Sequence, residues 1–255
     1  MGLALYTALA RLVLPFVLVA LWWRGRRHPA LRVPLGERLG RTAPALPWRA
    51  DQRPLWIHAV SVGEVQAAAG LIAALRLHHP RLPLLLTMAT ATGRARAESL
   101  YRDALLPDAS GHTALALAYA PFDLPGAAAA FLERARPVAA VFLETELWPN
   151  LLAACSARRL PVSLVSARVS ERSVRRYLRF APRLLRSMLG DLALIAAQTT
   201  ADRSRFVALG AAPERVLVTG NLKFDLSLPA DLAVRAQTQR DRYLGTRRAW
   251  VAGST

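Results

Sequence analysis

Short apolar runs alternate with polar or glycine-containing turns and with Ala- and Leu-rich stretches along most of the chain. The first run, Leu55–Val60, has the β-branched and aromatic composition of a buried strand. It passes through Ser61-Val62-Gly63-Glu64 into Val65–Leu77, which has a helical composition. Five further strands and one short one are expected over residues 82–87, 114–119, 137–143, 161–165, 192–197 and 216–219. The repeated strand–turn–helix order predicts an α/β fold with a parallel sheet.

A long apolar stretch, Gly2–Trp23, precedes these elements and could just span a bilayer, which takes about 20 residues. Arg11 opposes spanning, because an arginine at a helix centre costs roughly 2.5–3.5 kcal/mol on insertion scales. Trp22-Trp23 suits a membrane interface, and the arginines after it place the bulk of the chain on the cytoplasmic side. A cleaved signal peptide is disfavoured, because the basic cluster follows the apolar stretch. We expect residues 1–27 to form a membrane anchor helix, either spanning or lying in the interface.

The formal net charge of +17 requires an anionic partner or surface. Nucleic acid is the first candidate for such a charge. However, the arginines are spread over the predicted helices, and the sequence contains no nucleic-acid-binding motif. A membrane surface fits better, and we expect residues 28–53 to be a basic connector that lies against anionic head groups.

Cysteine and lysine each occur once. Cys155 alone excludes a disulfide framework within the chain and fits a reducing compartment. No Cys/His cluster has metal-ligand spacing, which argues against a metal site. Lys223 is the only lysine, so it is expected where a compact ammonium is needed instead of a planar guanidinium. The alternative is that this single lysine remains by chance.

Acidic residues follow the first and fourth predicted strands. Glu64 lies in the first turn of the helix after residues 55–60, and Glu144 and Glu146 follow residues 137–143. The carboxyl ends of parallel strands meet at one rim, where open α/β folds bind ligands. Paired carboxylates can shift one another's pKa and do acid–base work. The alternative for Glu64 is that it only complements the positive end of its helix.

Other polar turns are expected at the same rim. Thr92 and Gly93 follow the second strand, Ser166 and Arg168 follow the fifth, and Lys223 follows the last. Ser170 is expected to cap a long basic helix whose arginines form a solvated face or contact phosphorylated lipid: Arg172, Arg175, Arg176 and Arg179.

The last part of the sequence predicts a helix capped by Thr200 and ending at Gly210, and a polar helix over Leu226–Arg248. A strand is expected to begin at Trp250–Ala252, directly before the final Gly-Ser-Thr. We therefore expect the chain to be the first part of a longer protein.

Four segments together resemble the 3-deoxy-D-manno-octulosonic acid (Kdo) transferases. They are Ser61–Glu64, Glu144–Asn150, Ala167-Arg168 with Ser170, and Thr219–Asp225. The resemblance runs from the apolar N-terminus to the final Ala-Gly-Ser-Thr. The chain departs from the family pattern in its Thr-rich turn, which has Met88 and Ala91, and at Ser166, where the family usually has Asn.

The resemblance implies a fold of two Rossmann-like domains facing across a cleft, the GT-B arrangement. Residues 54–225 would form the N-terminal, acceptor-side domain, and residues 226–255 the linker and start of a nucleotide-sugar-binding domain. The implied reaction is transfer of Kdo from CMP-Kdo to a lipid A precursor, lipid IVA, at the cytoplasmic face of the bacterial inner membrane. No cofactor, metal or nucleic acid is expected, and anionic membrane lipids are expected partners. The 255-residue chain alone is expected to be inactive.

The resemblance also implies residue roles. Glu64 matches the proton acceptor, and Glu144 and Lys223 match groups that stabilise the transition state. The residues expected to bind substrate are Ser61, Gly63, Thr92, Gly93, Glu146, Arg168 and Asn221. Two alternatives remain open: a membrane-bound glycosyltransferase that uses another nucleotide sugar, and a non-catalytic module that binds an anionic sugar.

Overall fold

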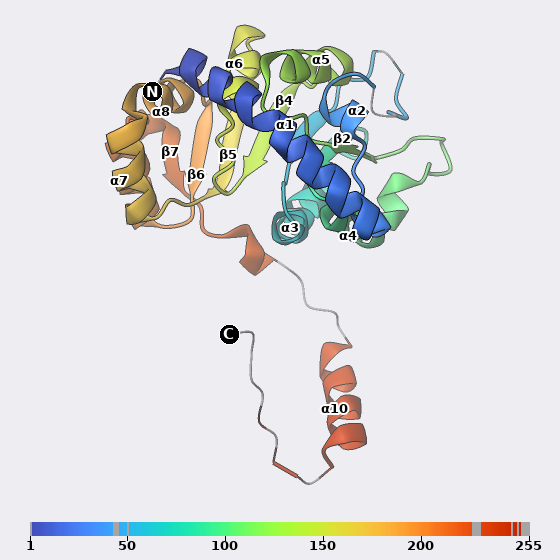
Figure 1. Ribbon diagram of the computed structural model, residues 1–255. Helices are drawn as coiled ribbons and strands as arrows, with labels where there is room; N and C mark the ends of the chain where they lie inside the picture. Colours follow the sequence, from blue (N-terminus) through green and yellow to red (C-terminus); the bar gives the residue numbers. More distant parts are fainter. Residues whose placement is uncertain are drawn as a thin grey trace.

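The computed structural model describes residues 2–42, 46–49, 51–225, 231–245, 247–248 and 250. Its centre is a seven-stranded sheet in the order β3-β2-β1-β4-β5-β6-β7, and all neighbouring strands are parallel. The strands are β1 (Leu55–His58), β2 (Leu84–Met88), β3 (Leu115–Tyr119), β4 (Ala139–Leu143), β5 (Val162–Ala167), β6 (Leu194–Ala197) and β7 (Val216–Val218). The predicted α/β fold with a Rossmann-like parallel sheet is confirmed (Figure 1).

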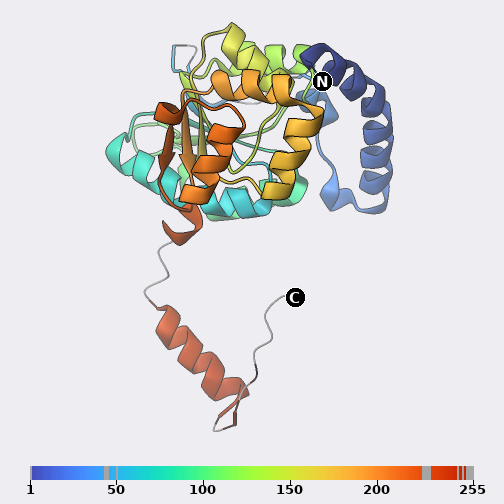
Figure 2. The same ribbon diagram turned by 90° about the vertical axis from the view of Figure 1, so that its left-hand side faces the viewer.

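Helices cover both faces of the sheet and connect its strands (Figures 1 and 2). The α-helices are α1 (Leu3–Arg27), α2 (Leu35–Arg38), α3 (Val62–His78), α4 (Ala91–Leu100), α5 (Pro125–Ala135), α6 (Pro149–Ala157), α7 (Glu171–Phe180), α8 (Pro182–Gly190), α9 (Thr200–Ala208) and α10 (Leu232–Tyr243). Short 3₁₀ helices are η1 (Pro29–Leu31), η2 (Arg102–Leu105), η3 (Pro213–Arg215) and η4 (Leu222–Asp225).

The core consists of two apolar layers, one on each face of the sheet. Successive side chains of a strand point to opposite faces. Ile57 accordingly packs with the layer of α3 and α4, whereas Trp56 packs with the layer that includes α5, α6, α8 and α9. The central strands are buried on both sides, which explains why their sequences are apolar runs without polar alternation.

The strand order reverses between β1 and β4. From β1 the chain proceeds outward through β2 to β3, then returns to β4 on the other side of β1 and continues to β7. The two strands pair in register, with Leu55 opposite Ala139 and His58 opposite Phe142. Their carboxyl ends therefore finish at the same level. Ligands of open parallel sheets bind at such a reversal.

Several sequence predictions are corrected in detail. The basic helix after Ser170 is two helices, because Pro182 begins α8 and α7 ends at Phe180. The cap of α9 is Thr199, whose hydroxyl accepts from the Asp202 amide, and not Thr200. The helix predicted over residues 226–248 is α10, which has no buried residue. Of the predicted final strand only Trp250 lies among the described residues, and it is not in a strand.

The connector over residues 28–53 is attached to the sheet through Arg38. This side chain is buried, and its Nε donates to the Ala120 carbonyl at 3.0 Å. Its Nη1 donates to the Ala89 carbonyl at 3.3 Å. Both carbonyls follow directly on strands, β2 and β3. Arg38 therefore fixes the connector to the carboxyl end of the sheet.

Candidate functional site

Glu64 begins the site at the carboxyl end of β1. Ser61 is the N-cap of α3, and its hydroxyl accepts from the Glu64 amide at 3.4 Å. The Glu64 carboxylate returns the interaction, accepting from the Ser61 hydroxyl at 3.2 Å and from the Val60 amide at 2.5 Å. This reciprocal arrangement resembles a capping box. The Glu64 side chain therefore caps the start of its own helix, which is the role that the alternative interpretation of the sequence predicted.

The environment of Glu64 gives it a second property. Its pKa is raised from 4.5 to about 7, mainly by burial and also by the nearby carboxylates of Glu146 and Glu144, against hydrogen bonds from Val60 and Ser61 that lower it. A group that served only as a helix cap would be favoured as a fully ionised carboxylate. A carboxylate with a pKa near 7 is suited to accept a proton near neutral pH.

Glu146 is held close to this site by aromatic packing. The Trp148 Nε1 group donates to Glu146 Oε2 at 2.6 Å, and burial raises the pKa of Glu146. The Trp148 ring stands edge-on to the ring of His58, with 4.9 Å between centroids. His58 is fully buried, and burial lowers its pKa to about 3, so it is neutral. A rigid, uncharged support thus lies beneath the loop that follows β4.

Glu144 joins two cations from distant parts of the chain. Its Oε1 accepts from Lys223 Nζ at 2.6 Å, and its Oε2 lies 3.4 Å from Arg168 Nε. The residue has a φ of 56°, in the left-handed region that a glutamate adopts only at an energetic cost. Such strain at the end of a central strand is typical of functional sites. The structure therefore brings together Glu144, Arg168 and Lys223, which the sequence predicted to share one rim.

A second network fixes the turn that carries Lys223. Asn221 Oδ1 accepts from the Lys223 amide at 2.9 Å and from the Ser166 hydroxyl at 3.3 Å, and its Nδ2 donates to Gln198 Oε1 at 3.2 Å. Gln198 Nε2 donates in turn to the carbonyl and hydroxyl oxygens of Ser166, at 2.9 and 3.1 Å. The sequence analysis did not predict Gln198 as a residue of the site. The available signal was its position as the first polar residue after the sixth strand.

Lys223 is also tied to the helix that carries Glu64. Its 3₁₀ helix η4 packs on α3 at Gly70, where a Cβ atom would come within 3.1 Å of the Asp225 Cβ and 3.2 Å of the Asp225 carbonyl oxygen. A larger residue at this position would press on Asp225 and push the two segments slightly apart. α3 thus bears Glu64 at its first turn and supports η4 six residues later.

A polar cavity of about 550 Å³ opens beside the Glu144 cluster. Arg168, Gln198 and the cap of α7 at Ser170 border it, and Arg205 forms part of its wall through ion pairs with Asp202 and Glu171 at 3.5 and 3.3 Å. Its full lining is Thr145, Arg168, Val169, Ser170, Ser173, Tyr177, Gln198, Asp202 and Arg205. Hydroxyl, amide and guanidinium groups of this kind suit a polar ligand such as a sugar.

The other residues predicted to bind substrate occupy the neighbouring turns. Gly63 is exposed in the first turn of α3, where a Cβ would meet only the Ser61 hydroxyl at 3.9 Å, so a ligand can approach closely. Thr92 and Gly93 lie in the first turn of α4, and both bond to the cap residue Thr90. A Cβ at Gly93 would come within 3.0 Å of the Thr90 hydroxyl. The structure therefore gives Gly93 a local role in capping α4.

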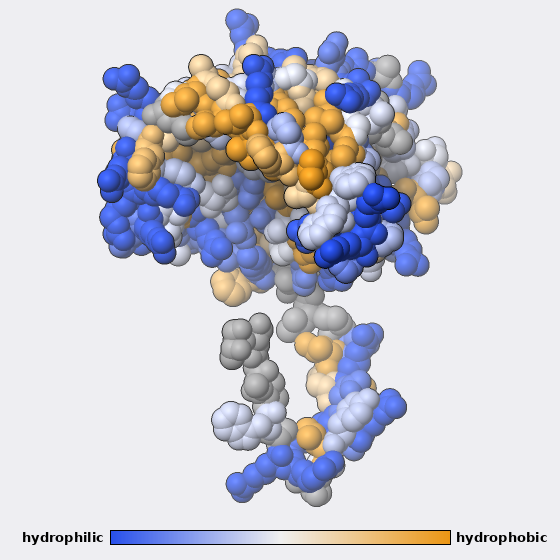
Figure 3. All heavy atoms as spheres, viewed as in Figure 1, coloured by the Kyte–Doolittle hydropathy of each residue, from blue (hydrophilic) through white to orange (hydrophobic). Residues whose placement is uncertain are grey.

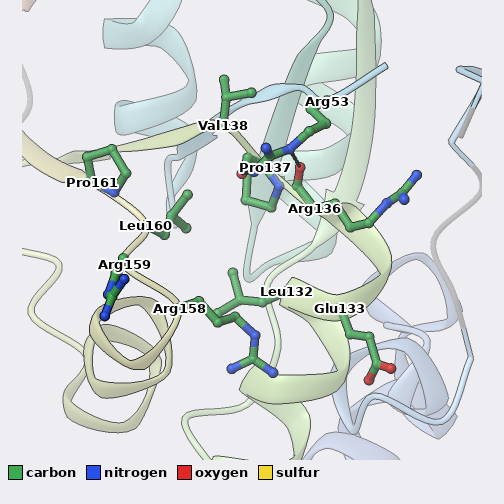
Figure 4. A pocket seen from close by; sticks show the side chains of 10 residues that line it. All are labelled: Arg53, Leu132, Glu133, Arg136, Pro137, Val138, Arg158, Arg159, Leu160 and Pro161. Carbon is green, nitrogen blue, oxygen red and sulfur yellow. Dashed lines mark hydrogen bonds between the residues drawn. The ribbon is translucent and has the colours of Figure 1, made fainter. Parts of the chain in front are cut away.

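A second basic cavity lies at the opposite, amino end of the sheet. It encloses about 500 Å³ and is bordered by Arg53, Arg136, Arg158 and Arg159, with one carboxylate, Glu133 (Figure 4). Arg53 donates to the carbonyls of Arg136 and Pro137, at 3.1 and 3.0 Å. Arg158 likewise donates to the carbonyls of Ala154 in α6 and Ala129 in α5. These arginines satisfy backbone groups before β4 and β5, away from the predicted site.

The chain is similar in sequence to known proteins. The family model described as 3-deoxy-D-manno-octulosonic-acid transferase matches residues 34–226. The chain is 40% identical to the Kdo transferase of Bordetella pertussis over 236 residues, which cover 90% of this chain and 51% of that protein. It is 32% identical to the Haemophilus influenzae Kdo transferase, covering 98% of this chain and 56% of that protein. The chain thus spans about half the length of these curated relatives.

Solved structures show a more distant likeness. UDP-GlcNAc 2-epimerase from Neisseria meningitidis has a TM-score of 0.48 and 15% identity, covering 75% of this chain and 51% of that chain. The S. aureus MnaA-UDP structure also has a TM-score of 0.48, with 16% identity, covering 74% of this chain and 51% of that chain. The family model covers the whole parallel sheet, from β1 to β7. The chain belongs to the 3-deoxy-D-manno-octulosonic acid transferase family.

Proposed function

We propose that this chain is the acceptor-side half of an enzyme that transfers Kdo from CMP-Kdo to the lipid A precursor lipid IVA, at the cytoplasmic face of the bacterial inner membrane. The observation that carries the proposal is Glu64. It is a buried carboxylate with a pKa raised to about 7, placed where the strand order reverses and beside the Glu144–Lys223–Arg168 cluster. A site for sugar transfer needs such a base and nearby cations.

Glu64 is the base in the proposed reaction. A hydroxyl of the acceptor gives its proton to the Glu64 carboxylate as its oxygen bonds to the anomeric carbon of Kdo. The bond from that carbon to the CMP phosphate oxygen breaks, and the electron pair leaves with CMP. The hydroxyl becomes acidic only as the new bond forms, so a base with a pKa near 7 is strong enough.

Lys223 and Arg168 supply positive charge near the reacting groups. Glu144 forms ion pairs with both and holds them on one side of the site. The Lys223 ammonium would face the departing phosphate or the Kdo carboxylate, where a charge-assisted hydrogen bond strengthens as charge develops. Two fixed side-chain cations can provide the stabilisation that other transferases take from a metal ion. We therefore propose a reaction independent of metals and cofactors.

The relatives extend for about twice the length of this chain. In the proposed enzyme the second Rossmann-like domain closes the other side of the cleft and holds most of the CMP group. The residues described here face the acceptor and the transferred sugar. The 255-residue chain by itself would then be inactive, because it forms one side of the cleft only.

The test uses the complete open reading frame expressed in membranes, with CMP-Kdo and lipid IVA as substrates. CMP release and product mass are followed for the native protein and for Glu64→Ala. We expect Kdo-bearing lipid from the native protein and at most a trace from the variant. Absence of product from a folded native protein would reject Kdo transfer and favour another nucleotide sugar or a binding module. Equal product from both proteins would reject Glu64 as the base.

A further inference from the structure

Helix α1 lies against α6 and against η1, the segment that directly follows it. One row of residues, spaced three or four apart and thus on one side of the helix, is partly or fully buried. The row consists of Tyr6, Thr7, Ala10, Leu14, Leu18, Leu21 and Gly25. At about 1.5 Å per residue the helix is about 37 Å long, so this row runs over a distance comparable with the thickness of a bilayer core.

Specific hydrogen bonds fix the start of α1 to the domain and its end to the connector that follows it. Near the start, the Thr7 hydroxyl bonds to Asn150 Oδ1 at 2.7 Å, and the Tyr6 hydroxyl bonds to the Asp123 carboxylate. Asp123 also accepts from the backbone amides that begin α6. Near the end of α1, Arg32 Nε donates to the backbone carbonyl of the buried Gly25 at 3.0 Å. The helix cannot leave the domain without breaking these contacts.

The opposite side of α1 is an exposed apolar row. It consists of Leu5, Leu9, Leu12, Phe16, Val19 and Trp23. Phe16 is 72% exposed and Leu12 67% exposed. Figure 3 shows the apolar side chains as a band that follows α1 and ends at blue, hydrophilic side chains. A helix that is apolar on all sides needs a second apolar environment for the side that the protein leaves uncovered.

We propose that α1 lies flat in one leaflet of the membrane, with its exposed row in the acyl region and its other side on the domain. This inference rests on the membrane association proposed above and decides how it occurs. A spanning α1 would have to carry the attached domain, with its charged surface, into the hydrocarbon core. No lipid-exposed loop or strand edge is stable there. A flat helix buries the apolar row and leaves every domain contact intact.

The charged residues of α1 agree with this orientation. Arg11 lies about 120° around the helix from the centre of the exposed row, so it reaches the head groups sideways instead of lying at the bilayer centre. At the far end, the guanidinium groups of Arg26 and Arg27 stack over the rings of Trp22 and Trp23, at 4.7 and 3.9 Å from the centroids. Tryptophan and arginine together suit the head-group level of an anionic leaflet.

The shape of α1 also fits a surface helix. Figure 2 shows α1 bending as it follows the edge of the domain. Pro15 lies in the middle of the helix, and proline is a usual cause of such a bend. The uncovered row therefore faces outward over the whole length of the helix.

The test measures the depth of each residue in the exposed row. The full chain with Cys155→Ala receives one new cysteine at a time, at each of the six positions of the row. Each variant is labelled with a nitroxide and bound to vesicles of phosphatidylglycerol and phosphatidylethanolamine. Collisional relaxation by oxygen and by a water-soluble nickel complex gives the depth. Val234→Cys on α10, 68% exposed, is the aqueous control.

A flat helix gives a similar, shallow depth at all six positions. A spanning helix gives a V-shaped profile, deepest near Leu12 and Phe16 and shallow at Leu5 and Trp23, and this result would overturn the proposal while leaving membrane association intact. Immobilised labels without vesicles, together with a dimeric mass in solution, would show that a second copy covers the row and would also overturn it. Failure to bind vesicles at all would instead reject the proposed membrane association itself.

Discussion

The two ends of the sheet carry the same unusual backbone feature for different reasons. Arg136 and Arg159, at the amino end, and Glu144 and Ser166, at the carboxyl end, all have φ between 43° and 56°. The two arginines terminate helices α5 and α6, where a left-handed residue is the normal way for a helix to end. Glu144 instead directly follows β4, and Ser166 lies within β5 where its pairing with β6 is irregular, so helix termination does not account for them.

Charge differs between the two ends in a similar way. The amino-end cavity is rich in arginine, and the guanidinium groups of Arg53 and Arg158 donate to nearby backbone carbonyls. At the carboxyl end, cations pair with Glu144, and Glu64 is kept in an environment that raises its pKa. A basic cavity alone is therefore a poor guide to function in an arginine-rich chain. A glutamate with a strained backbone that pairs with fixed cations, such as Glu144, is a better guide to function.

The largest expected effect is that of Glu64→Gln in the complete enzyme. Loss of a general base lowers kcat by about 10²–10⁴-fold, with little change in KM for the lipid acceptor. Because Glu64 must be ionised to accept a proton, native kcat should also fall about tenfold for each pH unit below about 7. Steady-state kinetics from pH 5.5 to 8.5 measures both. The control Glu133→Gln, at the amino end, should leave the rate unchanged, and an unaltered pH profile in Glu64→Gln would contradict the assignment.

Lys223→Arg should lower kcat by about 10–100-fold although the positive charge is kept. The planar guanidinium cannot place one point charge where the ammonium meets Glu144 at 2.6 Å. Kinetics of the complete enzyme gives the effect, and circular dichroism verifies the fold. Arg159→Lys at the amino end is the matched control and should be fully active. Native activity in Lys223→Arg would show that charge alone is sufficient.

Gln198→Ala should lower kcat about 3–10-fold, the usual worth of neutral hydrogen bonds. Gln198 contacts Asn221 and Ser166 and so acts on Lys223 indirectly. A double-mutant cycle tests this: in a Lys223→Ala background, the Gln198 change should cost almost nothing more. Additive losses would mean that Gln198 acts by a separate route, such as direct contact with substrate in the neighbouring cavity.

The smallest effects are expected from glycine at one positive-φ position of each end. Arg159→Gly should raise the free energy of unfolding by about 0.5–1 kcal/mol, because glycine adopts this backbone without strain. In Ser166→Gly the loss of the hydrogen bonds to Asn221 and Gln198 should offset that gain. Only Ser166→Gly should also lower kcat, since it removes a hydroxyl that bonds to Asn221. Urea titration and kinetics of both variants measure the difference. Reduced rates in both would erase the distinction between the two ends.

Much of this site follows from sequence because parallel strands impose it. An apolar run followed by a glycine turn places its next polar residue at the rim, so Glu64, Glu144 and Lys223 could be predicted to lie together. Gln198 could not, because its role arises from contacts with Ser166 in β5 and Asn221 in the turn after β7. The raised pKa of Glu64 also depends on burial by distant residues. The break at Pro182 was predictable, since proline cannot continue a preceding helix.

Helix α3 sets the spacing between the proposed base and the proposed cation. Glu64 is anchored by its first turn, and the segment bearing Lys223 is seated at Gly70, six residues or about 9 Å along the same axis. A length of regular helix, and not a loop, thus sets the distance between Glu64 and the segment that bears Lys223. A redesign for a larger or smaller acceptor would have to alter this helix, because changes in the surrounding turns leave its geometry as it is.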